Sequence, residues 1–144
     1  MKNLFKKILC PIDFDENSIA ALDAARDLAV DPNATVYMLY VVRMALAGFP
    51  KVLHPYPMTE QAARARLQDI AREHLEGKVH YGILIRTGDP SEEILRAAED
   101  FAVDSVVMAT HGRTEPGHFL LGSVAERVVR ESSRPVLTMR EPAP

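Results

Sequence analysis

The residues of this chain best suited to binding chemistry form a glycine-bearing segment after an apolar run. The run Val106–Met108 leads into Ala109-Thr110-His111-Gly112-Arg113, and the chain returns to a similar pattern at Gly122-Ser123-Val124-Ala125-Glu126. A buried strand, a loop and a helix start bind phosphate well, because the first helical turn has free N–H groups and a dipole that favours negative charge. Glycines can adopt positive φ and let a ligand approach the backbone. The segment therefore predicts a phosphate-binding loop.

A second interpretation of the same residues needs no ligand. A strand-to-helix connection uses flexible residues in any case. Ser123 and Glu126 fit the Ser-x-x-Glu capping box, in which Ser123 is a plain N-cap. The motif alone leaves both interpretations open.

The glycine spacing resembles the nucleotide motif of the universal stress protein family. That motif reads Gly, two residues, Gly, nine residues, then Gly followed by Ser or Thr. Gly112, the nine residues 113–121 and Gly122-Ser123 match it, whereas Ala109 stands where the family has its first glycine. The resemblance covers nearly all of the chain. The extra methyl group of Ala109 predicts a weakened affinity for the nucleotide but not its loss.

The resemblance implies which residues contact an adenine nucleotide. The phosphate end is expected to lie among Ala109, His111, Gly112, Arg113, Gly122, Ser123 and Val124. The nucleoside end is expected at Pro11, Ile12 and Asp13, with adenine against Val41. Three alternatives remain: Asp13 starts a turn with Asp15, Val41 is ordinary core, and Arg113 is a solvated charge.

The chemistry of these residues predicts binding more than turnover. The chain has no nucleophile elbow, no Walker lysine and no GxGxxG fingerprint with a following ribose acid, and Asp13 is the sole candidate carboxylate. We expect ATP, or AMP or ADP, with or without Mg²⁺, and at most very slow hydrolysis. The function that the resemblance implies is a homodimeric regulatory or signalling module of the stress response. The rivals are a protein-interaction module of the same fold without nucleotide, and a slow ATPase or phosphoryl transferase.

Two histidines and one long loop give weaker evidence of function. His111 and His118 lack the cluster and spacing of a known metal site, so no metal site is expected. The proline- and glycine-bearing loop Arg43–Met58 is long enough for a lid or a partner site, and plain disorder explains it equally well.

Strand and helix patterns alternate along the chain and must position these residues. Strands are predicted at Ile8–Ile12, Thr35–Val42, Val79–Arg86 near an edge, Ser105–Ala109 and Pro135–Met139. The first helix is predicted from Asn17 or Ser18 to about Val30, and the second from Thr59 to about Leu75. The third is predicted to begin at Pro90, with Asp89 as its cap. The fourth is predicted from Ser123 to about Ser132, with Ala125, Val128 and Val129 buried.

This alternation predicts an α/β fold, an open doubly wound five-stranded parallel sheet with helices on both faces, of Rossmann-like type. The family resemblance implies the strand order 3-2-1-4-5. In that order Asp13 and the Gly112 loop leave adjacent strands at the switch point, where open α/β sheets bind ligands.

Length and composition agree with one cytoplasmic domain over residues 1–144. The chain is 47% hydrophobic and 26% charged, with a formal net charge of −3 and one cysteine, Cys10. No basic stripe suggests nucleic acid, and no apolar run approaches a membrane span. The last predicted strand, Pro135–Met139, lies at a sheet edge in the strand order that the resemblance implies. Its residues Val136–Met139 carry no charge, so this edge is predicted to pair with its copy in a homodimer. A protein partner is expected but not identified.

Overall fold

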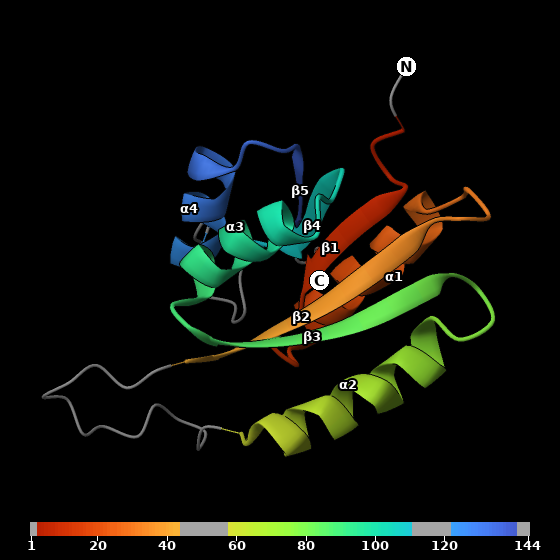
Figure 1. Ribbon diagram of the computed structural model, residues 1–144, viewed down its shortest axis with the longest axis horizontal. Coiled ribbons are helices and arrows are strands. Elements are labelled where there is room, and N and C mark those ends of the chain that lie inside the picture. Colours follow the sequence, from red (N-terminus) through yellow and green to blue (C-terminus); the bar gives the residue numbers. More distant parts are fainter. Residues whose placement is uncertain (1–2, 44–57, 111–121, 141–144) are drawn as a thin grey trace, which may run out of the picture.

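The computed structural model describes residues 3–43, 58–110 and 122–140, which form a five-stranded sheet with helices on both faces (Figure 1). All the strand pairs are parallel, and the strand order is β3-β2-β1-β4-β5, as expected. The elements are β1 (Lys7–Pro11), α1 (Glu16–Leu28), β2 (Thr35–Arg43), α2 (Glu60–His74), β3 (His80–Gly88), α3 (Pro90–Asp100), β4 (Ser105–Ala109), α4 (Ser123–Glu131) and β5 (Val136–Met139).

The helices are divided between the two faces in chain order. Residues of α1 and α2 share one core cluster with the sheet, whereas residues of α3 and α4 share the other. The chain therefore winds outward from β1 on one face, then crosses to the far side of β1 and winds outward on the other face. The direction reverses between β1 and β4. Within the described ranges, no helix is long and apolar enough to cross a membrane.

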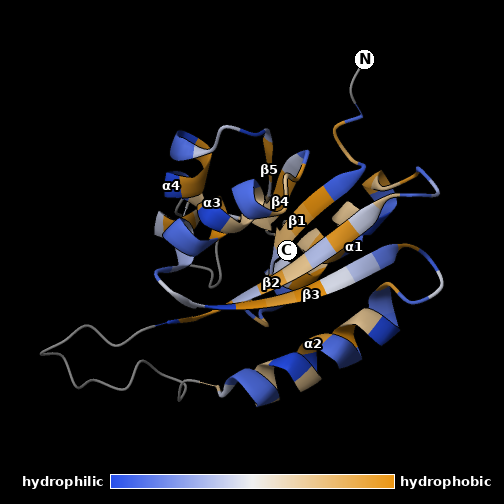
Figure 2. Ribbon diagram, in the orientation of Figure 1, coloured by the Kyte–Doolittle hydropathy of each residue, from blue (hydrophilic) through white to orange (hydrophobic). Residues whose placement is uncertain are grey.

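The central strand β1 shows how the sequence builds two cores at once. Ile8, Leu9 and Cys10 are all fully buried. Ile8 and Cys10 point to the α1 and α2 cluster and Leu9 to the α3 and α4 cluster, because successive strand side chains alternate between faces. Apolar residues are concentrated along the central strands, and the helices turn hydrophilic faces outward (Figure 2). Burial, and secondarily the charge of Asp23, raise the pKa of the Cys10 thiol, which stays protonated.

The predicted start and end of the first helix were wrong. The N-cap of α1 is Asp15, whose carboxylate accepts a hydrogen bond from the Asn17 N–H at 2.9 Å. Ser18 lies inside the helix, where its hydroxyl donates to the Asp15 carbonyl at 2.9 Å. The helix ends at Leu28, and Val30 is 83% exposed. Several residues with capping ability follow one another here, so local preference alone does not select the cap.

The predicted burial of α4 was also partly wrong. Val128 is fully buried, but its neighbour Val129 is 44% exposed. Successive helix residues point about 100° apart, so the core-facing stripe includes one valine and passes the other. The remaining strand bounds shift slightly: β5 begins at Val136, one residue after Pro135, and β3 continues to Gly88.

Candidate functional site

The candidate site lies where β1 and β4 end side by side in the middle of the sheet. Leu9 pairs with Val106; β1 ends two residues later at Pro11, and β4 ends three residues later at Ala109. On its other side, Pro11 pairs with Leu39 of β2. The connections from β1 and β4 leave toward opposite faces, as required for a ligand crevice in an open α/β sheet. The structure thus brings the two predicted halves of the site to one switch point.

The segment after β1 turns sharply at the rim of this crevice. The Ile12 N–H donates to the Leu39 carbonyl at 2.8 Å and extends the strand pairing by one residue. Asp13 is exposed, and its Oδ1 accepts a hydrogen bond from the Asp15 N–H at 3.0 Å. Asp13 therefore starts the turn into α1, and contact of its carboxylate with a ligand remains a prediction.

The two ends of the glycine-bearing segment meet beside the end of β4. The Thr110 N–H donates to the Met139 carbonyl at 3.0 Å, which continues the β4–β5 pairing, and the Gly122 N–H donates to the Thr110 carbonyl at 2.8 Å. Thr110 and Gly122, the described residues on either side of positions 111–121, are therefore in direct contact. The predicted site residues His111, Gly112 and Arg113, and also His118, lie outside the described residues.

The first turn of α4 differs from the predicted capping box. Its N-cap is Gly122, and Ser123 is the first helical residue, so the Ser123–Glu126 capping box was wrong. Gly122 has φ −60° and ψ 154°, so positive φ is not the reason for glycine here. Having no side chain, Gly122 offers no capping oxygen to the N–H groups that follow, and Ser123 is exposed. By contrast, side-chain oxygens cap the other helices, namely those of Asp15, Thr59 and Asp89.

The remaining predicted contacts lie within or against the core. Ala109 is the last residue of β4, partly buried and paired with Met139. Its φ is not positive, because among the described non-glycine residues only Phe14 and Ala102 have positive φ. Alanine in place of the motif glycine therefore does not strain the backbone. Val41 and Val124 are partly buried and pack against the α3 and α4 cluster, so contact of Val41 with adenine remains a prediction.

A polar cluster links α4 to the start of α3, close to the same edge of the sheet. Asp89 Oδ2 accepts from the Glu92 N–H at 3.0 Å and from the Ser91 hydroxyl at 2.7 Å. Arg127 of α4 donates to Asp89 Oδ2 at 3.2 Å and to Ser91 Oγ at 3.0 Å. These contacts lower the pKa of Asp89, first through the Glu92 N–H, then through Ser91 and the Arg127 charge. Arg127 lies one turn after Ser123, so the cluster holds the first turns of α4 in place.

Sequence reasoning missed the role of Arg127. Its partners Asp89 and Ser91 are 38 and 36 positions away, so no local spacing marks the contact. Asp89 itself was correctly predicted as the N-cap, because Asp followed by Pro is a local signal for a helix start. Among the described residues, no group of three or more His, Cys, Asp or Glu side chains could hold a metal ion.

We expect the Asp89 cluster to stabilise the fold in a pH-dependent manner. Asp89→Ala removes the cap and should lower the free energy of unfolding by about 1 kcal/mol at pH 7. Asp89→Asn keeps a capping oxygen and should lose less. Because the folded-state pKa lies below the ordinary value of 3.8, the advantage of Asp over Asn should be fully present above about pH 4. It should shrink as the pH falls through the folded-state pKa. Urea unfolding of the wild type and both variants at pH 7 and pH 3 checks this, and an advantage that grows at pH 3 would contradict it.

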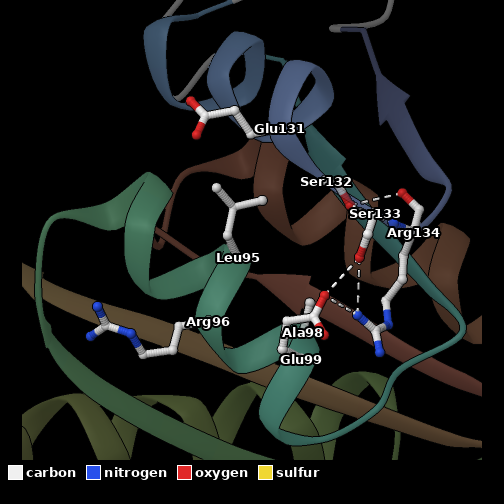
Figure 3. A pocket seen from close by; sticks show the side chains of 8 residues that line it. All are labelled: Leu95, Arg96, Ala98, Glu99, Glu131, Ser132, Ser133 and Arg134. Carbon is white, nitrogen blue, oxygen red and sulfur yellow. Dashed lines mark hydrogen bonds and ion pairs between the residues drawn. The ribbon is translucent and has the colours of Figure 1, made fainter.

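A hollow of about 340 Å³ lies at the opposite end of α4 (Figure 3). Its lining residues come from the second half of α3, from the last residue of α4 and from the chain between α4 and β5: Leu95, Arg96, Ala98, Glu99, Glu131, Ser132, Ser133 and Arg134. The Glu99 carboxylate accepts from the Ser133 hydroxyl at 2.6 Å and from Arg134 Nη1 at 2.5 Å. These charged groups already satisfy one another, so they offer no chemistry comparable to that at the switch point.

Comparison with known proteins identifies the family of this chain. Residues 4–140 match the Universal stress protein family, and the chain belongs to this family. Universal stress protein MJ0531 of Methanocaldococcus jannaschii is 33% identical over 146 residues, which cover 98% of this chain and 85% of that protein. Universal stress protein MJ0577 of the same organism is 30% identical over 159 residues, which cover 97% of this chain and 98% of the relative.

Solved structures show the same fold. The structure of MJ0577 superposes with a TM-score of 0.78 at 27% identity and covers 98% of this chain and 99% of that one. A family protein from Arabidopsis thaliana, solved with AMP bound, has a TM-score of 0.62 at 18% identity, with coverage of 96% and 93%. A universal stress protein in complex with cAMP has a TM-score of 0.67 at 22% identity, with coverage of 93% and 95%.

Proposed function

We propose that this universal stress protein binds an adenine nucleotide, ATP or else ADP or AMP, at the switch point between β1 and β4. The observation that carries the proposal is the start of α4. There a glycine N-cap leaves first-turn N–H groups without a capping side chain, beside the strand end that leads to Asp13. Such N–H groups and the helix dipole favour a phosphate. One nucleotide-binding domain, residues 1–144, carries this function in the cytoplasm.

The proposed site assigns a role to each end of the nucleotide. The phosphates lie at the start of α4, with the backbone N–H groups and the Ser123 hydroxyl as donors, and the segment with Gly112 and Arg113 completes this end. The nucleoside lies toward Pro11, Ile12 and Asp13, and adenine lies beside the backbone of Val41. Mg²⁺, where present, is coordinated by the phosphate oxygens, since it commonly keeps several waters and binds proteins through few carboxylates.

The solved relatives support the class of ligand. Proteins of this fold were solved with AMP and with cAMP, so the fold accommodates adenine nucleotides. Extraction of bound nucleotide from freshly purified protein, followed by identification by mass, tests the proposal. An adenine nucleotide in near-equimolar amount supports it. Protein that is free of nucleotide and also fails to bind millimolar ATP, ADP or AMP favours a protein-interaction module of the same fold.

We propose that the nucleotide acts as a regulatory signal and is hydrolysed very slowly at most. Asp13 is the only acidic group among the described site residues, and its Oδ1 already accepts the Asp15 N–H. Without a positioned base for water, turnover should stay far below about 1 s⁻¹, the lower end of ordinary enzyme rates. Phosphate release is measured for the wild type, Asp13→Asn and Ser123→Ala. Turnover near 1 s⁻¹ that disappears in either variant would identify an enzyme.

We also propose a homodimer formed by the free edge of β5. The Pro135 carbonyl accepts from the Val106 N–H at 2.9 Å and the Met139 carbonyl from the Thr110 N–H at 3.0 Å, and Thr138 lies between these two acceptors. Because successive residues of a strand direct their backbone groups to opposite sides, the Thr138 N–H faces the free edge. Leu137 is 39% exposed on the same strand. Such an edge can pair with its copy across a two-fold axis and closes without propagating.

Thr138→Pro should therefore weaken the dimer without removing a hydrogen bond of the monomer's own sheet. The expected change is roughly a tenfold rise in the dimer Kd, which corresponds to about 1.4 kcal/mol. Analytical ultracentrifugation across a concentration series measures it, and Thr35→Ser on β2 serves as a distant control. A wild type that stays monomeric well above micromolar concentration would refute the dimer.

A further inference from the structure

The turn that carries Asp13 contains a backbone conformation that its residue does not favour. Phe14 has φ +66°, in the left-handed region where bulky side chains are rare. This conformation lets the chain reverse so that the Asp15 N–H reaches Asp13 Oδ1 at 3.0 Å. Phe14 and Ala102 are the only non-glycine residues with positive φ in the described ranges. A strained residue persists only where surrounding contacts hold it. The contacts of Phe14 therefore help to set the position of Asp13, together with the hydrogen bond from the Asp13 N–H to Ser18 Oγ at 3.3 Å.

The contacts of the Phe14 ring come from two distant elements. Its centroid lies 4.8 Å from the ring centroid of Tyr40, in β2. The guanidinium carbon of Arg66, in α2, lies 4.1 Å from the Phe14 centroid on the ring face. A cation at this distance is attracted by the negative face of the ring. The ring therefore lies between Tyr40 of the sheet and Arg66 of α2, and it packs against the core cluster of α1 and α2.

We infer that Arg66 is a positioning residue for the nucleoside end of the site. It holds the Phe14 ring against Tyr40, the ring holds the left-handed backbone at Phe14, and this backbone presents the Asp13 carboxylate at the rim of the crevice. Arg66 itself does not touch the nucleotide. The inference rests on the proposed function, because it assumes that Asp13 meets the nucleoside.

The test measures affinity for ATP and for adenosine by calorimetry. Arg66→Met keeps the apolar stem and removes the cation. It should lower the affinity for ATP and for adenosine by the same factor, roughly three- to tenfold. Arg66→Lys keeps a cation and should retain most of the affinity. Arg64→Ala is the matched control, since Arg64 lies on the same helix, exposed and 3.8 Å from Glu60, and should change neither affinity.

A double-mutant cycle shows whether Arg66 acts through the ring. Phe14→Leu removes the aromatic face and should weaken binding by itself, and Arg66→Met should then add little in the Phe14→Leu background. Hydrogen exchange of the Asp15 amide gives a readout without nucleotide. It should become faster in Arg66→Met while the melting temperature stays within about 2 °C of the wild type, a shift typical of a small surface effect.

The outcomes separate the inference from the proposed function. In one outcome the wild type binds nucleotide, and Arg66→Met has the same affinities and the same Asp15 amide exchange as the wild type. This outcome would overturn the inference and leave the proposed function standing. A loss for ATP with none for adenosine would place Arg66 at the phosphates and overturn the positioning role. A wild type that binds neither ligand would overturn both.

Discussion

Saturating ATP should raise the melting temperature of this protein by roughly 5–10 °C. A ligand that binds only the folded state, at 100 times its Kd, stabilises that state by about 2.7 kcal/mol. For a chain of this length, each kcal/mol shifts the midpoint by a few degrees. Thermal unfolding with and without millimolar ATP, ADP or AMP measures the shift, and the nucleotide with the largest shift at equal concentration is the preferred one.

Gly122→Val should abolish this shift while the unliganded protein remains folded. Gly122 has φ −60° and ψ 154°, which valine can adopt, so the backbone does not require glycine. The added side chain would instead occupy the space in front of the first-turn N–H groups of α4. Valine is a poorer N-cap than glycine, so the unliganded variant should lose no more than about 1 kcal/mol. A Gly122→Val protein that shows the full ATP shift would place the phosphates elsewhere.

Val128→Ala should lower the free energy of unfolding by about 2 kcal/mol, and Val129→Ala should change it by no more than about 0.5 kcal/mol. Val128 is fully buried in the cluster beneath α3 and α4, whereas Val129 is 44% exposed. Removing two buried carbons forfeits their transfer free energy and leaves a cavity. Alanine is the better helix former at both positions, so this gain cancels when the two variants are compared.

Denaturant unfolding of the two single variants measures the difference between their free energies of unfolding. Both variants carry the same substitution, valine to alanine, in the same helix. The melting temperature of Val128→Ala should fall by roughly 5–10 °C. Equal losses at both positions would mean that Val129 is covered in solution, for example by a second copy of the chain. A repeat of the measurement at high and low protein concentration would distinguish that case, because a dimer contact depends on concentration.

The sequence by itself determined the class of fold, and it predicted the place of the site. Alternating strand and helix patterns predicted parallel strands joined by crossovers, and the residues that the structure describes form nine elements in that order. Local signals succeeded where the information lies within a few residues, as at Asp89-Pro90, which starts α3. Periodicity carries no information about which strands are neighbours. The strand order was therefore implied only by the family resemblance, which rests on the glycine motif and Asp13.

Only the tertiary structure decided which of several locally equivalent residues takes each role. Four residues from Asp13 to Ser18 can cap a helix, and in the folded chain Asp15 is the cap, directly after the left-handed Phe14. Two adjacent valines in α4 differ in burial because the sheet meets one side of the helix.

The contacts that hold the first turns of α4 and the Phe14 ring are likewise invisible to local patterns. Arg127 reaches Asp89 across 38 positions, and Arg66 reaches Phe14 from another helix. A phenylalanine in the left-handed region has no sequence signal, since its own preference opposes that conformation. It is held there by long-range contacts. Periodicity and capping are properties of short segments, whereas the geometry of the site depends on side chains that only folding brings together.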